Sequence, residues 1–282
     1  MAHTAPTASV LPPAPWKSLF KQHVSKMKTP QFVFSTLDVA PPGAPAPYVP
    51  RARYCIFRGF WTELLENPHS KAPRNPKVYE SDLPMFTTDV RMEKVGQIFR
   101  TGAGHADKKE QTQGSGGGGP VEAVWWCEES GTQWRIKGRA FVVAKDVEGN
   151  EESSGVRTLK SEVGKRMRIV DESREKEWSW ARELTAIFDA QSPVIQGSFK
   201  APPPGQPVQA PYDSENLQLG ATVSDPEDPI ARQNFRVVII VPDSVEQINL
   251  SDPATARRYR YTFDESGDTR ANAGWKTEEL WP

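Results

Sequence analysis

The sequence has little cysteine, little histidine and no surplus of either charge. Cys55 and Cys127 are its two cysteines; both lie in apolar runs, and they cannot form the disulfide framework of a small secreted domain. The four histidines are scattered, without cysteines or carboxylates at metal-ligand spacing, so no zinc or iron site is predicted. Lys and Arg total 35 against 36 Asp and Glu, which argues against a basic surface that holds nucleic acid or an anionic membrane. Any bound anion should be small and held locally.

Long apolar runs are also lacking. None approaches the roughly 18 residues that a membrane-spanning helix needs. Residues 1–13 are rich in proline and alanine but have neither the basic nor the apolar region of a signal peptide, and they predict a flexible tail. Walker loops, GxSxG nucleophile elbows and GxGxxG helix starts are absent as well. We therefore expect a reduced, soluble protein of the cytoplasm.

Proline and tryptophan, in contrast, are abundant, with 26 and nine residues among 282. The prolines gather at 41–50, 201–211 and 226–229, which predicts loops there. The run GSGGGGP at 114–120 predicts a flexible surface loop, and it is not a phosphate-binding loop because no GK[ST] follows it. We expect a single domain over residues 14–282. Its loop insertions are expected at about 102–120, 146–172 and 201–232.

Hydrophobic periodicity predicts more strands than helices. Helices are expected at 14–27, 90–100 and 173–188. Short connections between neighbouring strands indicate hairpins and meanders rather than parallel crossovers. The expected fold is mainly β (α+β), an antiparallel barrel that is closed or nearly closed, with peripheral helices. Its strands are expected at 31–39, 49–57, 83–89, 122–129, 132–146, 235–242, 245–250 and 258–263.

Polar side chains interrupt several of these predicted strands. The segment PRARYCIFRGFW (50–61) places Arg53 and Cys55 on one strand face, although a buried guanidinium is costly without acceptors or an anion. The segment MFTTDVRMEK places two hydroxyls, those of Thr87 and Thr88, between a strand and a helix. Either these groups lie on the wet face of a sheet, or they face a ligand.

Further polar groups follow later in the chain. Lys94 lies one helical turn into the helix that follows the two threonines. Gln133 and Arg135 share one strand face, and Arg258 and Arg260 share another. Each feature alone is typical of an exposed strand or a helix cap. Together they supply guanidinium, ammonium and hydroxyl donors for a phosphate, while an amide such as that of Gln133 can donate to and accept from a heterocycle.

The order of these motifs resembles a known family. The chain shows PW..LF in a helix, then F.F.T, R.R....RGF, F.TD.R..K and Q.RI.G, and finally a late pair of strands that ends in arginine. This order resembles the pyridoxamine 5'-phosphate oxidase-like FMN-binding split barrels. The likeness covers about residues 14–145 well and 178–263 loosely. It implies an antiparallel split β-barrel that binds FMN.

The resemblance also implies roles for individual residues. In this family FMN lies between two subunits, so a homodimer and a small-molecule substrate are expected, with no nucleic acid and no membrane as partners. Gln133 would reach the flavin ring from the partner subunit, and Lys94 and Arg53 would meet the phosphate. The cofactor-binding residues implied in this way are Arg53, Ile56, Thr87, Thr88, Lys94, Gln133 and Arg260, and the substrate-binding residues are Arg58 and Arg258.

The sequence departs from the family pattern at three places. The Ser-Arg pair before the phosphate-binding lysine is Met92-Glu93 here, and the substrate-binding Arg-x-His reads Ala256-Arg257-Arg258. The tryptophan near the flavin is replaced within VEQINL. Three functions therefore stay open: an FMN-dependent oxidoreductase with another substrate, a non-catalytic binder of FMN or a small anion, and a structural or interaction protein.

Overall fold

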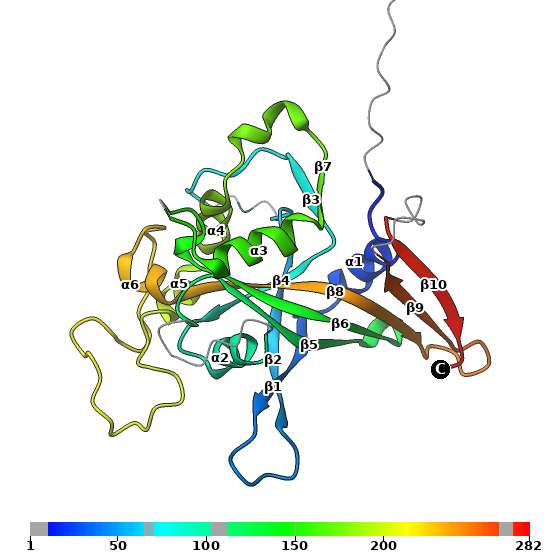
Figure 1. The fold of residues 1–282 in the computed structure, drawn as a ribbon, viewed down its shortest axis with the longest axis horizontal. Helices are drawn as coiled ribbons and strands as arrows, with labels where there is room; N and C mark the ends of the chain where they lie inside the picture. The colour runs from blue at the N-terminus through cyan, green and yellow to red at the C-terminus, as the bar shows by residue number, and fades with distance from the viewer. Residues whose placement is uncertain (1–10, 65–66, 68–69, 103–111, 150, 265–272) are drawn as a thin grey trace, which may run out of the picture.

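We analysed a computed structural model that describes residues 11–64, 67, 70–102, 112–149, 151–264 and 273–282. Most of the predicted tail at 1–13, and residues 103–111 of the first predicted insertion, lie outside these described residues. One curved antiparallel sheet dominates the fold (Figure 1). Its strands follow one another in the order β10 (Trp275–Leu280), β9 (Arg257–Phe263), β8 (Phe235–Asn249), β4 (Pro84–Asp89), β2 (Tyr48–Phe60), β1 (Gln31–Val39), β5 (Gly116–Cys127) and β6 (Thr132–Val143).

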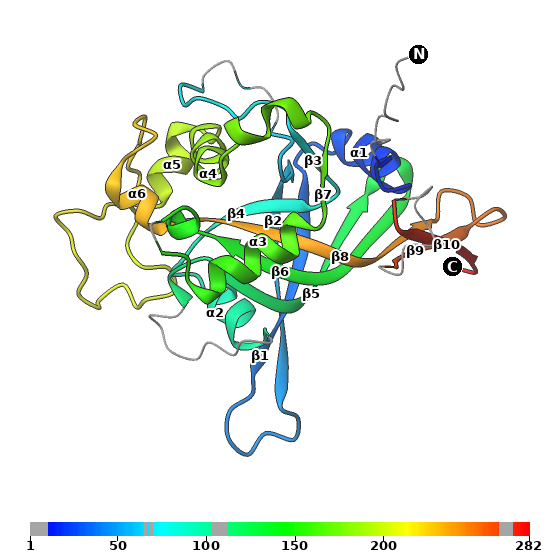
Figure 2. The same cartoon turned by 45° about the horizontal axis from the view of Figure 1, so that its top comes forward.

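An additional pairing of β6 with β8 closes this sheet into a barrel, from which β9 and β10 extend. The predicted antiparallel split barrel is therefore confirmed, as is the hairpin of β1 and β2. This hairpin projects from the body of the molecule in both views (Figures 1 and 2). A small separate sheet pairs β3 (Tyr79–Ser81) with β7 (Met167–Ile169).

Helices cover the barrel at its end and on its sides. Figure 2 shows α4 (Trp180–Asp189), α5 (Pro193–Ser198) and α6 (Pro229–Asn234) grouped on the side of the molecule away from α1 (Lys17–Ser25), while α3 (Ser154–Gly164) packs on β5. Short 3₁₀ helices lie at Glu128–Ser130, Lys145–Val147 and Glu172–Glu177. The α-helices of the described residues are α1 (Lys17–Ser25), α2 (Glu93–Arg100), α3 (Ser154–Gly164), α4 (Trp180–Asp189), α5 (Pro193–Ser198) and α6 (Pro229–Asn234). None of the helices in the described part of the chain is long and apolar enough to cross a membrane.

Aromatic side chains fill the barrel and fix α1 at its end. Trp16 and Phe20 of this region are fully buried. The Phe20 ring meets those of Trp125 and Trp134 edge-on, with centroids 5.0 and 5.5 Å apart. Such edge-to-face pairs add to the gain from burying apolar area. The abundance of tryptophan thus serves the core to a large extent.

A second core lies outside the barrel. The outward-facing side chains of β8 pack against α3 and α4, where Leu159 and Ile187 are fully buried. Because the first half of β8 is covered on both faces, residues 237–242 form a continuous apolar run. The separate strands predicted at 235–242 and 245–250 are in fact this one strand, which corrects the prediction.

Two predicted insertions contain regular structure. Segment 146–172 was expected to be an insertion, but it includes α3 and β7, and Leu159 of α3 belongs to the second core. The helix expected at 173–188 begins only at Trp180, after a 3₁₀ turn. In the third predicted insertion, 201–232, residues 201–228 have no helix or strand and extend outward in both figures, whereas α6 begins at Pro229.

The glycine run was also predicted wrongly, because Gly116–Pro120 belongs to β5 and not to a surface loop. A Cβ on Gly117, whose φ is +104°, would lie 2.7 Å from Cγ2 of Ile98 in α2. A Cβ on Gly119 would lie 2.6 Å from the Ile98 carbonyl oxygen. The glycines are therefore needed for the close packing of α2 on this strand.

Candidate functional site

A cavity of about 450 Å³ opens where β2, β4 and the start of α2 meet the segment after α5. Volumes of this size are typical of small-molecule sites. We call this cavity the anion pocket, for the reasons that follow. It is lined by Tyr54, Cys55, Ile56, Arg58, Thr87, Thr88, Asp89, Met92, Lys94, Ile195, Ser198, Phe199, Ala201, Pro202 and Pro204.

Lys94 supplies a buried ammonium to the anion pocket. Its side chain is on the first turn of α2, and the residue is only 9% exposed. Nζ donates to Oγ1 of Thr88 at 3.1 Å, and no carboxylate of the described residues forms an ion pair with it. Burial lowers the pKa of Lys94, because water no longer stabilises the charged form. A buried cation without a counter-ion is suited to bind an anion.

Arg53 lies beside this pocket but is held by neutral groups. Its Nη1 donates to Oγ1 of Thr36 at 2.7 Å, and its Nη2 donates to Oε1 of Gln97 at 2.7 Å. The guanidinium is thus oriented without being neutralised by a carboxylate of the described residues. Arg51, two residues earlier, is largely exposed and lies 3.9 Å from Asp38.

Gln97 is a residue of this region that sequence reasoning missed. It is fully buried in α2, where its Oε1 also accepts from Oγ1 of Thr36 at 2.6 Å and its Nε2 donates to Asp38 at 3.2 Å. The sequence feature that could have identified Gln97 is its position as a polar residue on the apolar side of the helix, between Val95 and Ile98. Gln97 fixes the rotamer of Arg53.

Arg91 anchors the wall of the anion pocket that comes from the second half of the chain. It pairs with Asp89 at 2.6 Å, and its Nη1 donates to the carbonyl oxygen of Ala201 at 3.0 Å. This bond holds the start of the long segment after α5 against the pocket. Sequence reasoning did not find this wall, since proline and phenylalanine in a predicted loop carry no chemical signature.

Arg58 lines the anion pocket without any partner in the described residues. Its Nε is buried and has no hydrogen-bond acceptor. Burial lowers the pKa of Arg58. The structure therefore places five of the predicted residues around one pocket, with Arg53 beside them. These five are Ile56, Arg58, Thr87, Thr88 and Lys94.

Two of the remaining predicted residues, Arg258 and Arg260, form a second group with Arg135 and Glu246 on β6, β8 and β9, which we call the arginine cluster, and Gln133 lies on β6 two residues before Arg135. Arg260 donates through Nε to Oε1 of Glu246 at 3.0 Å, and Arg135 and Arg258 lie 3.6 and 3.9 Å from Oε2 of the same carboxylate. Arg135 also donates to Glu122 at 2.7 Å. Burial would raise the pKa of Glu246, but the three guanidinium groups hold it below its usual value.

The anion pocket and the arginine cluster lie far apart in one chain. Thr88 is opposite Arg236 near the start of β8, whereas Gln133 and Arg258 are both opposite Ile248 near its end. Twelve residues of strand at about 3.3 Å each correspond to roughly 40 Å along β8. A single FMN molecule does not span that distance.

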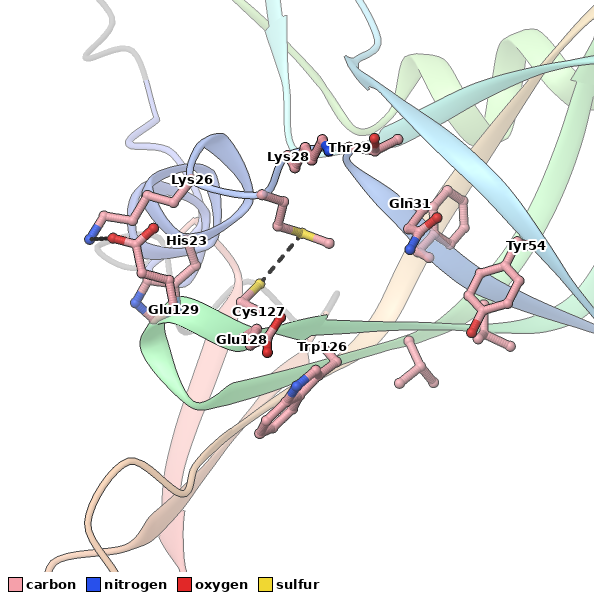
Figure 3. A pocket seen from close by; sticks show the side chains of 14 residues that line it. His23, Lys26, Lys28, Thr29, Gln31, Tyr54, Trp126, Cys127, Glu128 and Glu129 are labelled. Carbon is pink, nitrogen blue, oxygen red and sulfur yellow. Dashed lines mark hydrogen bonds and ion pairs between the residues drawn. The ribbon is translucent and has the colours of Figure 1, made fainter.

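A larger opening of about 710 Å³ lies on the outer face of the barrel between these two groups (Figure 3). It includes two large exposed aromatic residues: Tyr54 of β2 is 72% exposed and Trp126 of β5 is 50% exposed. Lys26 and Glu129 form an ion pair at its other end. Exposed aromatic groups beside apolar strand residues are typical of surfaces that contact another protein.

The comparisons with known proteins identify a family domain and a shared fold. Residues 13–144 match the family model described as "Pyridoxamine 5'-phosphate oxidase, FMN-binding domain". A search of curated proteins found no match.

Two solved structures share the fold. A pyridoxamine 5'-phosphate oxidase-related, FMN-binding protein from Nostoc punctiforme PCC 73102 is 18% identical, with a TM-score of 0.57 over 96% of this chain and 100% of that one. PhzG from Burkholderia lata 383, solved in complex with tetrahydrophenazine-1-carboxylic acid, is 16% identical, with a TM-score of 0.50 over 96% of this chain and 94% of that one. Residues 13–144 therefore match the FMN-binding domain of pyridoxamine 5'-phosphate oxidases, and the chain as a whole shares its fold with these two FMN-domain neighbours.

Proposed function

We propose that this protein is a cytoplasmic FMN-dependent oxidoreductase that acts as a homodimer on a small-molecule substrate. The observation that carries the proposal is the buried ammonium of Lys94, which has no carboxylate partner in the described residues and lines a pocket of a family known for FMN. When bound, FMN supplies hydride transfer, so no side chain of the protein needs to be a strong acid or base.

The residues of the anion pocket fit the parts of an FMN molecule. Lys94 and Arg53 carry positive charges that suit the phosphate. The hydroxyls of Thr87 and Thr88 would bind the ribityl chain or the edge of the ring, and the apolar side chain of Ile56 would pack on the ring. The protein's contribution in this proposal is to bind and orient the cofactor and to exclude water from it.

The separation of the two groups supports the proposed homodimer. Along β8, Gln133 lies roughly 40 Å and Arg260 roughly 33 Å from Thr88, so they cannot reach an FMN in the pocket of their own chain. A two-fold-related copy would bring its own Gln133 and Arg260 to that pocket, and the same contact would complete the second site. Gln133 would then contact the ring and Arg260 the flavin edge, while Arg258 would face the substrate.

A row of paired residues on one face of the sheet supports this arrangement. Its apolar end includes the exposed Tyr54, which would be covered in a dimer, and its charged end is the arginine cluster. Cross-strand partners point to the same side of a sheet. The row runs through successive pairs from Tyr54 to Val33, Val124, Arg135, Glu246 and Arg260.

Subunit complementation tests the shared site. Lys94→Ala and Arg260→Ala homodimers should each bind FMN weakly, because every site lacks one group. Coexpression of the two chains, with different affinity tags, should yield mixed dimers with one intact site that binds one FMN tightly. Mixed dimers that bind no better than either parent would contradict the shared site, and a wild-type protein without FMN affinity would contradict FMN binding itself.

One observation favours a second candidate function, a non-catalytic binder of FMN or a small anion. Glu93 precedes Lys94 in place of the arginine expected in the family, so one positive charge near the phosphate is replaced by a negative one. Anaerobic mixing with candidate electron donors separates the two functions. Bleaching of the flavin absorbance near 450 nm would support the oxidoreductase. A flavin that stays oxidised with every donor would favour the binder.

A further inference from the structure

We propose that a second cleft, beside Arg58, binds the apolar body of an organic carboxylate, and that the Arg58 guanidinium holds its carboxylate group. The cleft has a volume of about 460 Å³ and lies between α1 and the end of β2. We call it the α1 cleft. That such a carboxylate is the substrate rests on the proposed function, whereas its binding can be tested without FMN.

The α1 cleft is mostly apolar. Val24 and Met27 approach it from α1 and the turn after it, and Phe57 and Phe60 approach it from β2. Phe57 and Phe60 meet edge-on at 5.5 Å, so this wall is fixed by aromatic packing. A volume and lining of this kind suit an aromatic or aliphatic body rather than a sugar or a nucleotide.

Arg58 is the unsatisfied cation of this cleft. Its Nε is buried without an acceptor, and no hydrogen bond or ion pair to Arg58 is found among the described residues. The acidic residue of the cleft, Glu63, is already bound by Lys17, which is buried, and lies 3.6 Å from Lys21. The guanidinium is therefore left for an acceptor from outside the chain, and a carboxylate matches its fork of donors in a bidentate way.

Arg58 also connects this cleft with the anion pocket, because it lines both. A carboxylate bound to Arg58 would place the adjoining carbon atoms next to the cavity proposed for FMN. The rest of the molecule would extend toward α1. This geometry assigns the substrate to the class of apolar monocarboxylates.

A matched pair of probes tests the site on the FMN-free protein. 2-Naphthoate and 2-naphthamide share one ring system, but only the first is an anion. Titration of their fluorescence should show saturable binding of naphthoate, with tenfold to a hundredfold weaker binding of the amide. Arg58→Gln should reduce the affinity for naphthoate by a similar factor and leave that for naphthamide within about twofold. Lys21→Gln, at an exposed position on the rim, should have little effect.

A second variant tests the location. Ser25 lines the α1 cleft but not the anion pocket, so Ser25→Trp should fill the cleft, remove naphthoate binding and preserve FMN affinity. Circular dichroism checks that each variant is folded. The proposal is overturned if wild-type protein shows no saturable naphthoate binding at millimolar concentration, if the amide binds equally well, or if folded Ser25→Trp binds naphthoate like the wild type. Failure of FMN binding alone would overturn the proposed function and not this site.

Discussion

The anion pocket and the arginine cluster both place positive charges on the same barrel, but the two regions differ in how these charges are compensated. In the cluster, Glu246 is surrounded by Arg135, Arg258 and Arg260, so a buried carboxylate compensates the guanidinium groups. At the anion pocket, Lys94 is held by a hydroxyl and the neighbouring Arg53 by an amide, and no carboxylate in the part of the chain that the structure describes forms an ion pair with either. The charges of the cluster are thus compensated within the chain, whereas the ammonium of Lys94 has no ion-pair partner among the described residues.

This difference indicates whether each region contributes mainly to the stability of the fold or to ligand binding. Removing one charge from a compensated cluster leaves its partner unpaired, so the main cost should appear in stability. Removing a charge from an uncompensated pocket relieves repulsion and desolvation in the empty protein, so the cost should appear in ligand binding. Substitution of Glu246, which has no proposed contact with FMN, should therefore mainly reduce stability, whereas substitution of Lys94 should mainly reduce FMN affinity.

The largest expected effect concerns the anion pocket. Lys94→Ala and Arg53→Ala each remove a charged contact to the phosphate, worth about 1.5–3 kcal/mol. FMN affinity should fall by roughly tenfold to a hundredfold in each variant, measured by quenching of flavin fluorescence. The melting temperature of the empty Lys94→Ala protein should stay within a few degrees of wild type or rise.

The controls for this experiment are Arg51→Ala and Arg139→Ala. Arg51 is half exposed, and Arg139 pairs with Glu162 at 2.8 Å, away from the pocket. Both variants should bind FMN with wild-type affinity. If all four variants bind equally well, Arg53 and Lys94 are not phosphate ligands.

Much of the barrel could be predicted from sequence because its pattern is local. The segments 31–39 and 49–57 are rich in strand-forming residues and are joined by a Pro/Gly turn, and the structure pairs them as predicted. The grouping of Ile56, Arg58, Thr87, Thr88 and Lys94 followed from the order of family motifs. Whether these residues bind FMN and substrate stays a prediction.

Other features could not be predicted because they depend on contacts distant in sequence. The glycine run at 114–120 has the composition of a loop, and only the approach of α2 makes Gly117 and Gly119 necessary parts of a strand. Glu246 looks like an ordinary polar residue until β6 and β9 bring arginines to it. The secondary-structure propensity of a residue does not include such contacts between distant segments.

The next largest effect should come from the contact between α2 and the glycines of β5. Gly119→Val would place a side chain against the Ile98 carbonyl and push away the helix that carries Lys94 and Gln97. We expect a loss of about 1–3 kcal/mol in unfolding free energy and weaker FMN binding. Urea denaturation and FMN titration measure the two effects. Gly164→Ala, in α3 with open space around its Cβ, should be neutral or slightly stabilising. Equal stability of the two variants would show that α2 does not need the glycine.

In the arginine cluster, Glu246→Gln should destabilise the fold. The carboxylate is buried, but its arginine partners are partly exposed, so we expect about 1–2 kcal/mol in urea denaturation. The matched control is Glu279→Gln, because Glu279 pairs with Arg257 at 3.1 Å with both side chains exposed, and it should cost less than about 1 kcal/mol. Equal costs would remove the distinction between a compensated cluster and an ordinary surface pair.

Glu246 should also give the two regions different responses to acid. Its pKa is lowered in the folded protein, so its contribution to stability is present above its unfolded pKa of about 4.3 and is lost as pH falls through the folded value. Thermal denaturation at decreasing pH should show this loss in wild type. The loss should be smaller in Glu246→Gln, and an identical acid profile of the two proteins would contradict this role.

The smallest expected effect lies at alkaline pH and belongs to Lys94. Because burial lowers its folded pKa, the unfolded chain binds more protons between the folded value and the ordinary one of about 10.4. The stability of the FMN-free protein should therefore rise slightly with pH in that window, while FMN affinity falls as the ammonium loses its proton. Bound phosphate would hold the proton on Lys94 and suppress the rise. Thermal denaturation of free and FMN-saturated protein between about pH 8 and 10 measures this contrast, with Lys94→Met as the control that lacks both trends. If the free and saturated proteins respond to pH in the same way, or if Lys94→Met behaves like wild type, Lys94 is not the cation that the phosphate meets.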